Sequence, residues 1–151
     1  MIAVVRPAKL TDTPVIAEFN CLLAEESEDK HLDPDTVVAG VTALFEFTER
    51  GQYYVAEIDG KIVGQLLITY EWSDWRNGLF WWIQSVYVAA EHRRTGVFSS
   101  LYKKVSGIAR HEPTVCGIRL YVEAENEQAR NTYTALGMSH TGYEVMEIDF
   151  T

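Results

Sequence analysis

A basic turn that contains a glycine lies between an apolar run and an amphipathic run in the second half of the chain. The apolar run ends at Val88 and predicts a strand, and the run that begins near Thr95 predicts a helix. The first N–H groups of a helix lack intrahelical partners, and the helix dipole places roughly half a positive charge there. Arg93 and Arg94 add cationic donors, and Gly96 lets the backbone approach a pyrophosphate closely. The turn therefore predicts an anion site, with a helix start that carries solvated arginines as the alternative.

A second group of candidate residues lies on a predicted helix over residues 125–136, which Gly137 closes. Asn126, Ala129 and Tyr133 are spaced at i, i+3 and i+7, so they share one face of that helix. A tyrosine phenol, with an ordinary pKa of about 10, is a potential proton donor. The same residues also suit an ordinary helix surface, so this pattern by itself indicates function only weakly.

Aromatic residues are dense between residues 70 and 82, where they include Trp72, Trp75 and Trp82. Aromatic rings attract cations through cation–π interactions, so this run could enclose a cationic substrate. Packing in a core is the alternative interpretation. The four histidines show no spacing typical of a metal site, so we expect no metal.

The composition predicts one domain over residues 1–151, because 47% of the residues are hydrophobic and can form a real core. The formal net charge of −9 argues against nucleic-acid binding, which depends on neutralised phosphates, and suits a cationic substrate such as an amine. Two isolated cysteines, Cys21 and Cys116, indicate a reducing compartment. With no signal peptide and no apolar run of about 20 residues, we expect a soluble cytoplasmic protein.

The periodicity of apolar side chains predicts the elements that position these residues. Residues 25–29 are expected to form a polar loop, and Asp59-Gly60 a hairpin turn. Strands are predicted at residues 2–6, 53–58, 61–70, 79–88, 116–122 and 143–150, with helices from about residue 11, from 34, over 95–110 and over 125–136. This order predicts one mixed sheet with helices on both faces.

Residues 93–98 resemble the Q/R-x-x-G-x-G/A signature of the GNAT (GCN5-related N-acetyltransferase) superfamily, in which this turn cradles the pyrophosphate of CoA. Phe98 stands where the family usually has Gly or Ala. Asn126 and Tyr133, followed by Leu-Gly-Met at residues 136–138, are similar to the last part of the GNAT motif. The resemblance covers essentially the whole chain. It implies an α/β GNAT fold, with a central, twisted, mixed but mostly antiparallel sheet of six to seven strands and about four helices on both faces.

The resemblance also implies how acetyl-CoA, the expected co-substrate, is held. In GNAT folds the strand before the turn and the strand at residues 116–122 splay apart, and the pantetheine arm pairs with main-chain groups of the earlier strand. Buried backbone N–H and C=O groups need such a partner. The expected acetyl-CoA ligands are Val86, Tyr87, Val88, Arg93, Arg94, Thr95, Gly96, Val97, Phe98, Asn126, Ala129 and Tyr133.

Amine acetylation needs a base that takes a proton from the amine and an acid that returns one to the departing thiolate. The resemblance assigns the acid role to Tyr133. Some GNAT proteins carry a Glu on the central strand, but this chain has Gln84 there, and an amide cannot take the proton. Glu71, Glu123 and a water relay stay open as the base. The expected substrate contacts are Trp72, Trp75, Trp82 and Gln84.

These features together predict an enzyme, an N-acetyltransferase that moves the acetyl group of acetyl-CoA to a primary amine by direct attack. A non-catalytic module that binds or senses acyl-CoA is the alternative, because Gln84 and Phe98 both depart from the family pattern. A nucleic-acid-binding domain built on His92 and its neighbouring arginines is a third class, which the net charge disfavours. The expected partner is a small-molecule or peptide amine; a homodimer is left open, and neither nucleic acid nor a membrane is expected.

Overall fold

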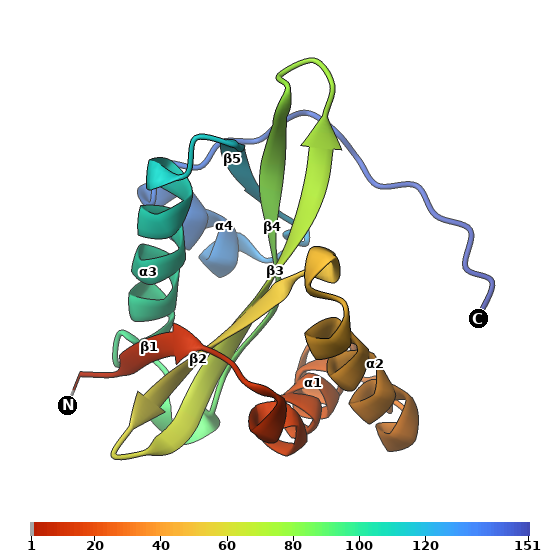
Figure 1. The fold of residues 1–151 in the computed structure, drawn as a ribbon, viewed down its shortest axis with the longest axis vertical. Coiled ribbons are helices and arrows are strands. Elements are labelled where there is room, and N and C mark those ends of the chain that lie inside the picture. The colour runs from red at the N-terminus through yellow and green to blue at the C-terminus, as the bar shows by residue number, and fades with distance from the viewer. Residues whose placement is uncertain (1) are drawn as a thin grey trace. The chain divides into compact units, whose positions relative to one another are not determined.

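The computed structural model describes residues 2–151, which divide into two compact units, residues 2–120 and 121–151. The first unit holds the sheet and three α-helices, and the second holds a short helix followed by an extended segment (Figure 1). The strands are β1 (Val4–Pro7), β2 (Gln52–Ile58), β3 (Lys61–Ser73), β4 (Gly78–Val88) and β5 (Val115–Leu120). The α-helices are α1 (Thr13–Glu28), α2 (Pro34–Glu46), α3 (Val97–His111) and α4 (Glu127–Ala135). Short 3-10 turns occur at η1 (Leu10–Asp12), η2 (Thr48–Arg50) and η3 (Ala90–His92).

The strands form one sheet in the order β1-β2-β3-β4-β5. Neighbours are antiparallel, except that β4 and β5 are parallel. Parallel neighbours need a crossover connection, and α3 provides it between β4 and β5. The predicted mixed, mostly antiparallel sheet is confirmed, but residues 2–151 contribute five strands to it instead of six to seven.

The lower strand count comes from the end of the chain. Alternating apolar side chains over residues 143–150 predict a final strand, yet residues 138–151 form neither helix nor strand. A strand must pair its backbone N–H and C=O groups with a neighbour, and a favourable side-chain pattern does not supply that neighbour. The prediction of a strand at residues 143–150 is therefore wrong.

Helices cover both faces of the sheet, as predicted. α1 and α2 pack on one face, and α3 packs on the other (Figure 1). The core between the sheet and the first two helices contains Ile16, Ala17, Val41, Tyr53, Val55 and Leu67. The apolar residues that α3 buries are Val97, Leu101, Tyr102, Val105 and Ala109. No helix among residues 2–151 is both long and apolar enough to cross a bilayer.

Polar side chains fix where the first two helices begin. Asp33 accepts a hydrogen bond from the backbone N–H of Thr36 at 3.1 Å and so caps α2. Arg6 on β1 forks between Asp12, directly before α1, and Glu57 on β2, at 2.8 and 2.7 Å. The Arg6 guanidinium holds the pKa of the Asp12 carboxyl below its ordinary value. This fork ties the edge strand to both the start of α1 and the next strand.

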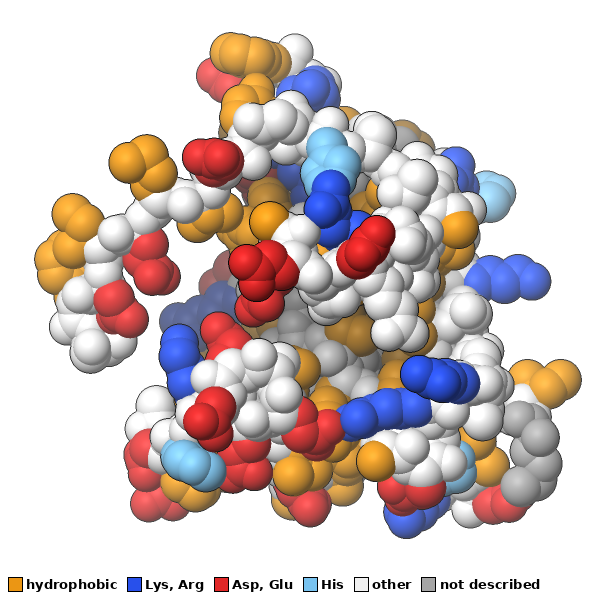
Figure 2. All heavy atoms as spheres, turned by 180° about the vertical axis from the view of Figure 1, so that it is seen from behind, with side chains coloured by type: hydrophobic (Ala, Val, Ile, Leu, Met, Phe, Trp, Pro, Cys, Tyr) orange, Lys and Arg blue, Asp and Glu red, His pale blue; other side chains and the backbone are white. Residues whose placement is uncertain are grey.

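The acidic run at residues 25–29 belongs to a helix. α1 continues to Glu28, and Asp29 ends it in the left-handed conformation at φ 51°. Alanine and glutamate are good helix formers, so the helix propagates through this run, and the prediction of a polar loop is wrong. Acidic side chains gather on the part of the surface formed by α1 and α2 (Figure 2, lower left).

The packing of α3 on the sheet makes a stability prediction at Gly64 on β3. A Cβ atom at Gly64 would lie 2.7 Å from Cγ1 of Val97, the first residue of α3. We expect Gly64→Ala to destabilise the fold by about 1–3 kcal/mol, the usual cost of overpacking, measured by chemical denaturation. In a Val97→Ala background the same substitution should cost much less, because the clashing methyl group is gone.

Gly107→Ala on α3 is the matched control, since nothing lies within 4 Å of its added Cβ. It should stabilise the fold by about 0.5–1 kcal/mol, because alanine has the higher helix propensity. Equal losses for Gly64→Ala with and without Val97 would contradict the proposed contact.

Candidate functional site

The central feature of the site is the point where β4 and β5 stop pairing. Their parallel ladder runs from Leu79 opposite Val115 to Ile83 opposite Leu120, where β5 ends. β4 continues to Val88, and β5 offers no partner to its last five residues. Residues 84–88 therefore carry backbone N–H and C=O groups on that side which β5 does not satisfy.

A β-bulge lies in the same stretch of β4. Gln65 pairs with Tyr87 and Leu67 pairs with Gln84, so Ser85 and Val86 together oppose the single residue Leu66. Ser85 has a φ of 50°, which is uncommon for a residue other than glycine. A bulge bends its strand and re-aims the backbone groups around it. This bulge turns the main chain of β4 where the pairing with β5 has just ended.

A network of buried polar side chains hydrogen-bonds to the bulge. Gln65 is fully buried, with 0% exposure. Its amide nitrogen donates to the Ser85 carbonyl at 3.1 Å and to Oδ1 of Asn20 on α1 at 2.8 Å. Asn20 in turn donates to the Tyr53 hydroxyl at 3.1 Å. Burial raises the pKa of Tyr53, and hydrogen bonds with the Asn20 and Ser85 side chains partly offset that rise. The network joins α1, β2 and β3 to the strained residue of β4.

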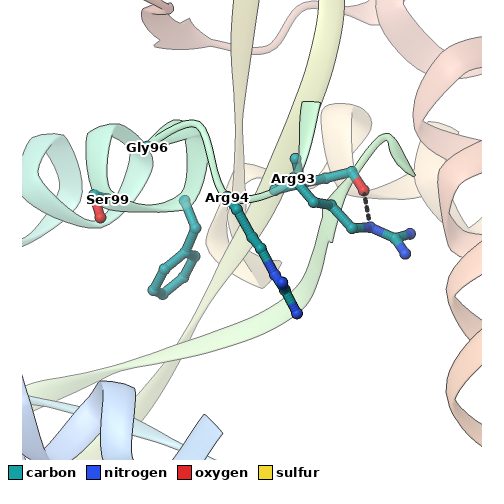
Figure 3. Close-up of a pocket in the computed structure, with 6 residues that line it drawn as sticks. Arg93, Arg94, Gly96 and Ser99 are labelled. Atoms are coloured by element: carbon teal, nitrogen blue, oxygen red, sulfur yellow. Dashed lines mark hydrogen bonds between the residues drawn. The ribbon is translucent and has the colours of Figure 1, made fainter. Parts of the chain in front are cut away.

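The predicted anion-binding turn follows β4 and lies beside a cavity. Gly96 has a φ of 87°, a left-handed conformation that suits glycine, and it is the N-cap of α3 without any side-chain cap. A cavity of about 320 Å³ is lined by Val88, Arg93, Arg94, Gly96, Phe98 and Ser99. Figure 3 shows Arg94 extending from the turn and Ser99 on the first turn of α3. An uncapped helix end beside a cavity and a cationic side chain is an arrangement that can hold an anion.

The two arginines of the turn differ in their partners. Arg93 donates from Nε to the Val88 carbonyl at 2.9 Å (Figure 3). It also donates from Nη2 to Glu26 of α1 at 2.5 Å. Glu26 also accepts a hydrogen bond from the Tyr87 hydroxyl at 2.5 Å. Among residues 2–151 no side chain forms an ion pair with Arg94, which leaves its charge available to a ligand. Arg93 therefore ties the turn to α1, whereas Arg94 is the free cation at the cavity.

The hydrogen bond between Tyr87 and Glu26 shifts the pKa values of these two groups in opposite directions. Burial, followed by the adjacent carboxylate, raises the pKa of Tyr87 to about 12. Hydrogen bonds from Tyr87 and then Arg93 lower the pKa of Glu26, so it stays ionised at neutral pH. Tyr87 is itself buried, so its side chain is not available to a ligand.

A polar patch lies on the sheet face that α1 and α2 partly cover. Oε1 of Glu71 accepts from Trp82 Nε1 at 2.9 Å and from Arg119 Nη1 at 3.0 Å. The Arg119 guanidinium stacks over the Phe80 ring, 3.6 Å from its centroid. The Trp82 hydrogen bond and then Arg119 lower the pKa of Glu71, which makes it a weaker base than an isolated carboxylate.

The predicted substrate residues lie in two places. Gln84 donates to Thr69 at 2.5 Å and shares the face of Trp82, because side chains alternate along a strand. Trp72 pairs with Leu79 on the opposite face and is 59% exposed, and Trp75 in the β3–β4 turn is 85% exposed. The structure brings Glu71, Trp82 and Gln84 to one face but does not bring Trp72 and Trp75 to it.

The second unit carries the remaining predicted residues. Asn126 is the N-cap of α4, and its side-chain oxygen Oδ1 accepts a hydrogen bond from the Ala129 N–H at 3.1 Å. This oxygen therefore caps the helix. Tyr133 is half-buried on the same helix, and burial raises the pKa of its phenol. Glu123 is exposed in the segment before α4, and Gly137, at φ 94°, follows the helix.

Family comparison places these features in a known group. A family model described as the Acetyltransferase (GNAT) family matches residues 16–138. The matched range includes the β4 bulge, the basic turn and α4. The chain belongs to the GNAT family. No match was found among curated proteins.

Solved structures agree with the GNAT assignment. A possible acetyltransferase from Clostridium difficile 630 is 43% identical, with a TM-score of 0.92 and coverage of 100% of this chain and 99% of that chain. A ribosomal-protein-alanine N-acetyltransferase from Brucella melitensis biovar Abortus 2308 is 16% identical, with a TM-score of 0.78 and coverage of 99% and 100%. A predicted acetyltransferase with acetyl-CoA from Clostridium acetobutylicum is 17% identical, with a TM-score of 0.79 and coverage of 98% and 96%. The last two likenesses show the fold alone.

The sequence did not point to several residues of this GNAT site. Asn20, Glu26 and Tyr53 resemble ordinary helix or strand residues, and only the fold brings them to β4. Gln65 left a weak signal, because it is the one amide in the apolar run of residues 62–68. A lone buried amide in such a strand indicates a specific hydrogen-bonded partner.

The network behind the bulge makes a second stability prediction. Gln65→Leu keeps the size of the side chain but removes the donors to Asn20 and Ser85. Each buried acceptor left without a donor costs about 1–3 kcal/mol, so we expect a clear loss of stability in denaturant. Amide hydrogen exchange at residues 85–88 should also become faster, because the bulge loses its support.

Gln128→Leu, at an exposed position on α4, is the control for the change of residue type and should leave both measurements unaltered. Unchanged exchange at residues 85–88 in a folded Gln65→Leu variant would show that the bulge holds without the network.

Proposed function

We propose that this GNAT protein is an N-acetyltransferase that transfers the acetyl group of acetyl-CoA to a primary amine of a small molecule or peptide. The observation that carries the proposal is the continuity of two unsatisfied features. Residues 84–88, the part of β4 that does not pair with β5, lead through the basic turn into the uncapped start of α3 beside Arg94. An extended ligand with an amide-containing arm and a pyrophosphate matches both features.

The residues present suit acetyl-CoA as co-substrate. Main-chain groups of Val86 and Val88 would pair with the amides of the pantetheine arm, since β5 does not reach them. The N–H groups at the start of α3, with Arg94, would hold the pyrophosphate. Phe98 departs from the family signature, but its side chain lines the cavity and leaves the main chain to act. One solved structure of the same fold is described as a predicted acetyltransferase with acetyl-CoA.

The chemical step replaces a C–S bond by a C–N bond. A neutral amine attacks the thioester carbonyl carbon, the C–S bond breaks, and the sulfur leaves with its electron pair. The amine loses one proton, and the thiolate gains one. We assign the donor of the second proton to Tyr133, which burial keeps protonated at neutral pH.

The burial that keeps Tyr133 protonated also limits it as an acid. Its pKa is raised above the ordinary value of 10, whereas a free thiol has a pKa of about 8.5. Proton transfer to a fully formed thiolate would therefore be uphill. We expect a contribution near the lower end of the 10²–10⁴-fold range that is usual for general acid catalysis.

The general base that takes the proton from the amine has two candidates, Glu71 and Glu123. Glu71 pairs with Phe80 on β4, five residues from Ser85, which corresponds to about 16 Å along the strand. This separation and its contacts with Trp82 and Arg119 favour a water relay from Glu71 over direct proton transfer. Gln84, next to the bulge, can orient such a water or the amine by hydrogen bonding. Glu123 remains the other candidate base.

A module that binds acyl-CoA without turnover is the second candidate. It is favoured by the amide of Gln84 beside the bulge and by the ion-paired state of Glu71, which leave no strong base on β3 or β4. Thiol release from acetyl-CoA in the presence of a panel of primary amines separates the two functions. Release that depends on an amine supports the transferase, and tight binding without release supports the module.

A charge placed at the cavity tests the cofactor site. Ser99 lines the cavity on the first turn of α3, where a new side chain meets no backbone strain. Ser99→Glu should weaken acetyl-CoA binding at least tenfold in calorimetry, because a carboxylate would face the pyrophosphate. Ser99→Gln, of the same size but neutral, should weaken it much less. Equal affinities of the Glu and Gln variants would contradict a phosphate site at this turn.

The acid role is tested by Tyr133→Phe, which keeps the ring and removes the proton donor. We expect kcat to fall about 100-fold while the KM for acetyl-CoA stays within about twofold. Tyr143→Phe, at a tyrosine that is 76% exposed, is the control and should keep wild-type turnover. Wild-type kcat in Tyr133→Phe, with chemistry rate-limiting, would leave Tyr133 as a packing residue.

A further inference from the structure

The carboxylate of Glu26 holds both ends of the segment that joins β4 to the basic turn. Its Oε2 accepts a hydrogen bond from the hydroxyl of Tyr87, near the end of β4, and its Oε1 accepts one from Nη2 of Arg93. The Arg93 guanidinium also lies over the Tyr87 ring, 5.4 Å from its centroid, and donates to the Val88 carbonyl. One side chain of α1 therefore closes a ring of contacts around this connection, and every member of the ring belongs to the unit of residues 2–120.

The ion pair between Glu26 and Arg93 has a buried anchor. The two side chains are 40% and 45% exposed, and an isolated pair at such a surface contributes little to stability. Glu26 is not isolated, because the hydroxyl of Tyr87, a residue with 6% exposure, fixes one of its oxygens. The other oxygen is thereby aimed at Arg93, so the three side chains act as a network and not as a single surface pair.

The next residue, Arg94, has a backbone conformation that needs such support. Its φ is 61°, in the left-handed region, where residues other than glycine are uncommon. A strained conformation of this kind persists only where the surrounding contacts fix the chain. Glu26 holds Arg93 on one side of it, and on the other side the Thr95 hydroxyl donates to the His92 carbonyl. The direction of the Arg94 side chain thus depends on these flanking contacts.

Figure 3 shows the side chains of Arg93 and Arg94 leaving the turn in different directions. We propose that Glu26 is a positioning residue for acetyl-CoA binding. It holds Arg93, and Arg93 in turn keeps Arg94 in the left-handed conformation that directs its charge toward the pyrophosphate. Glu26 is not among the residues that line the cavity, so it acts through the turn and not by contact with the ligand. This inference rests on the acetyl-CoA site of the proposed function.

The sign of the effect separates positioning from the simple electrostatic effect of a nearby charge. Glu26 is an anion beside a turn that would bind an anion, so its charge alone opposes the binding of pyrophosphate. If Glu26 acted only through this charge, its neutralisation would tighten acetyl-CoA binding. Positioning predicts the opposite result, because a turn without the Glu26 contacts no longer holds Arg94 at the cavity.

The first test is the affinity of the Glu26→Gln variant for acetyl-CoA in calorimetry. Glutamine keeps the size of the side chain, but its NH₂ group is a donor and cannot accept from Tyr87 or Arg93. We expect the Kd to rise about tenfold, within the range for residues coupled by direct contacts. Glu18→Gln, the same change at an exposed position of α1, is the matched control and should not raise the Kd. An unchanged or lower Kd in a Glu26→Gln variant with the wild-type circular dichroism spectrum would overturn the inference.

A double-mutant cycle then shows whether Glu26 acts through Arg94. In an Arg94→Gln background, Glu26→Gln should change the Kd by less than about twofold, because no charge is left to position. The same tenfold loss with and without Arg94 would indicate a general structural role and would also overturn the inference. If the cycle behaves as expected but no amine promotes thiol release, the transferase activity fails and the role of Glu26 stands. A wild-type protein that does not bind acetyl-CoA would overturn both.

Discussion

Every backbone N–H and C=O group that leaves water needs a hydrogen-bonded partner, and the site of this protein depends on one place where the sheet does not supply it. β5 ends opposite Ile83, while β4 runs on to Val88. The bulge at Ser85 adds to this break in pairing, because it turns the main chain just beyond the last paired residue. A ligand with amide groups can complete the ladder, and the uncapped start of α3 extends the same surface toward a phosphate.

The rest of the first unit holds this break in place. Asn20 on α1 accepts a hydrogen bond from Gln65, which in turn supports the bulge of β4. Glu26 on the same helix reaches Tyr87 of β4 and Arg93 of the basic turn. The same helix buries Ile16 and Ala17 in the core, so packing on one side of α1 fixes polar contacts on the other. Gly64 allows Val97 to approach β3 closely and thereby fixes the first turn of α3. Stability and site geometry therefore rest on the same few contacts.

Although the chain is strongly acidic, it presents the cationic side chain of Arg94 beside the start of α3. The net charge is −9, and much of the acidic surface lies on α1 and α2. Glu26 neutralises Arg93, whereas Arg94 has no ion-pair partner among the described residues. This distribution would draw an anionic ligand to the start of α3 and the proposed cationic acceptor to the acidic surface around the first two helices.

The sequence by itself determined the local elements and the turn. Apolar periodicity located α1, α2, α3 and β2 to β4, and the Arg-Arg-Thr-Gly run identified the helix start that faces the cavity, because these depend on neighbours along the chain. Tertiary structure decided what depends on distant partners. It gave Arg93, but not Arg94, a salt bridge with Glu26. It brought Asn20, Tyr53 and Gln65 together next to Ser85. It also placed Trp72 and Trp75 away from Trp82. It also left residues 143–150 without a strand neighbour, since a side-chain pattern states which face is apolar but not which backbone will pair with it.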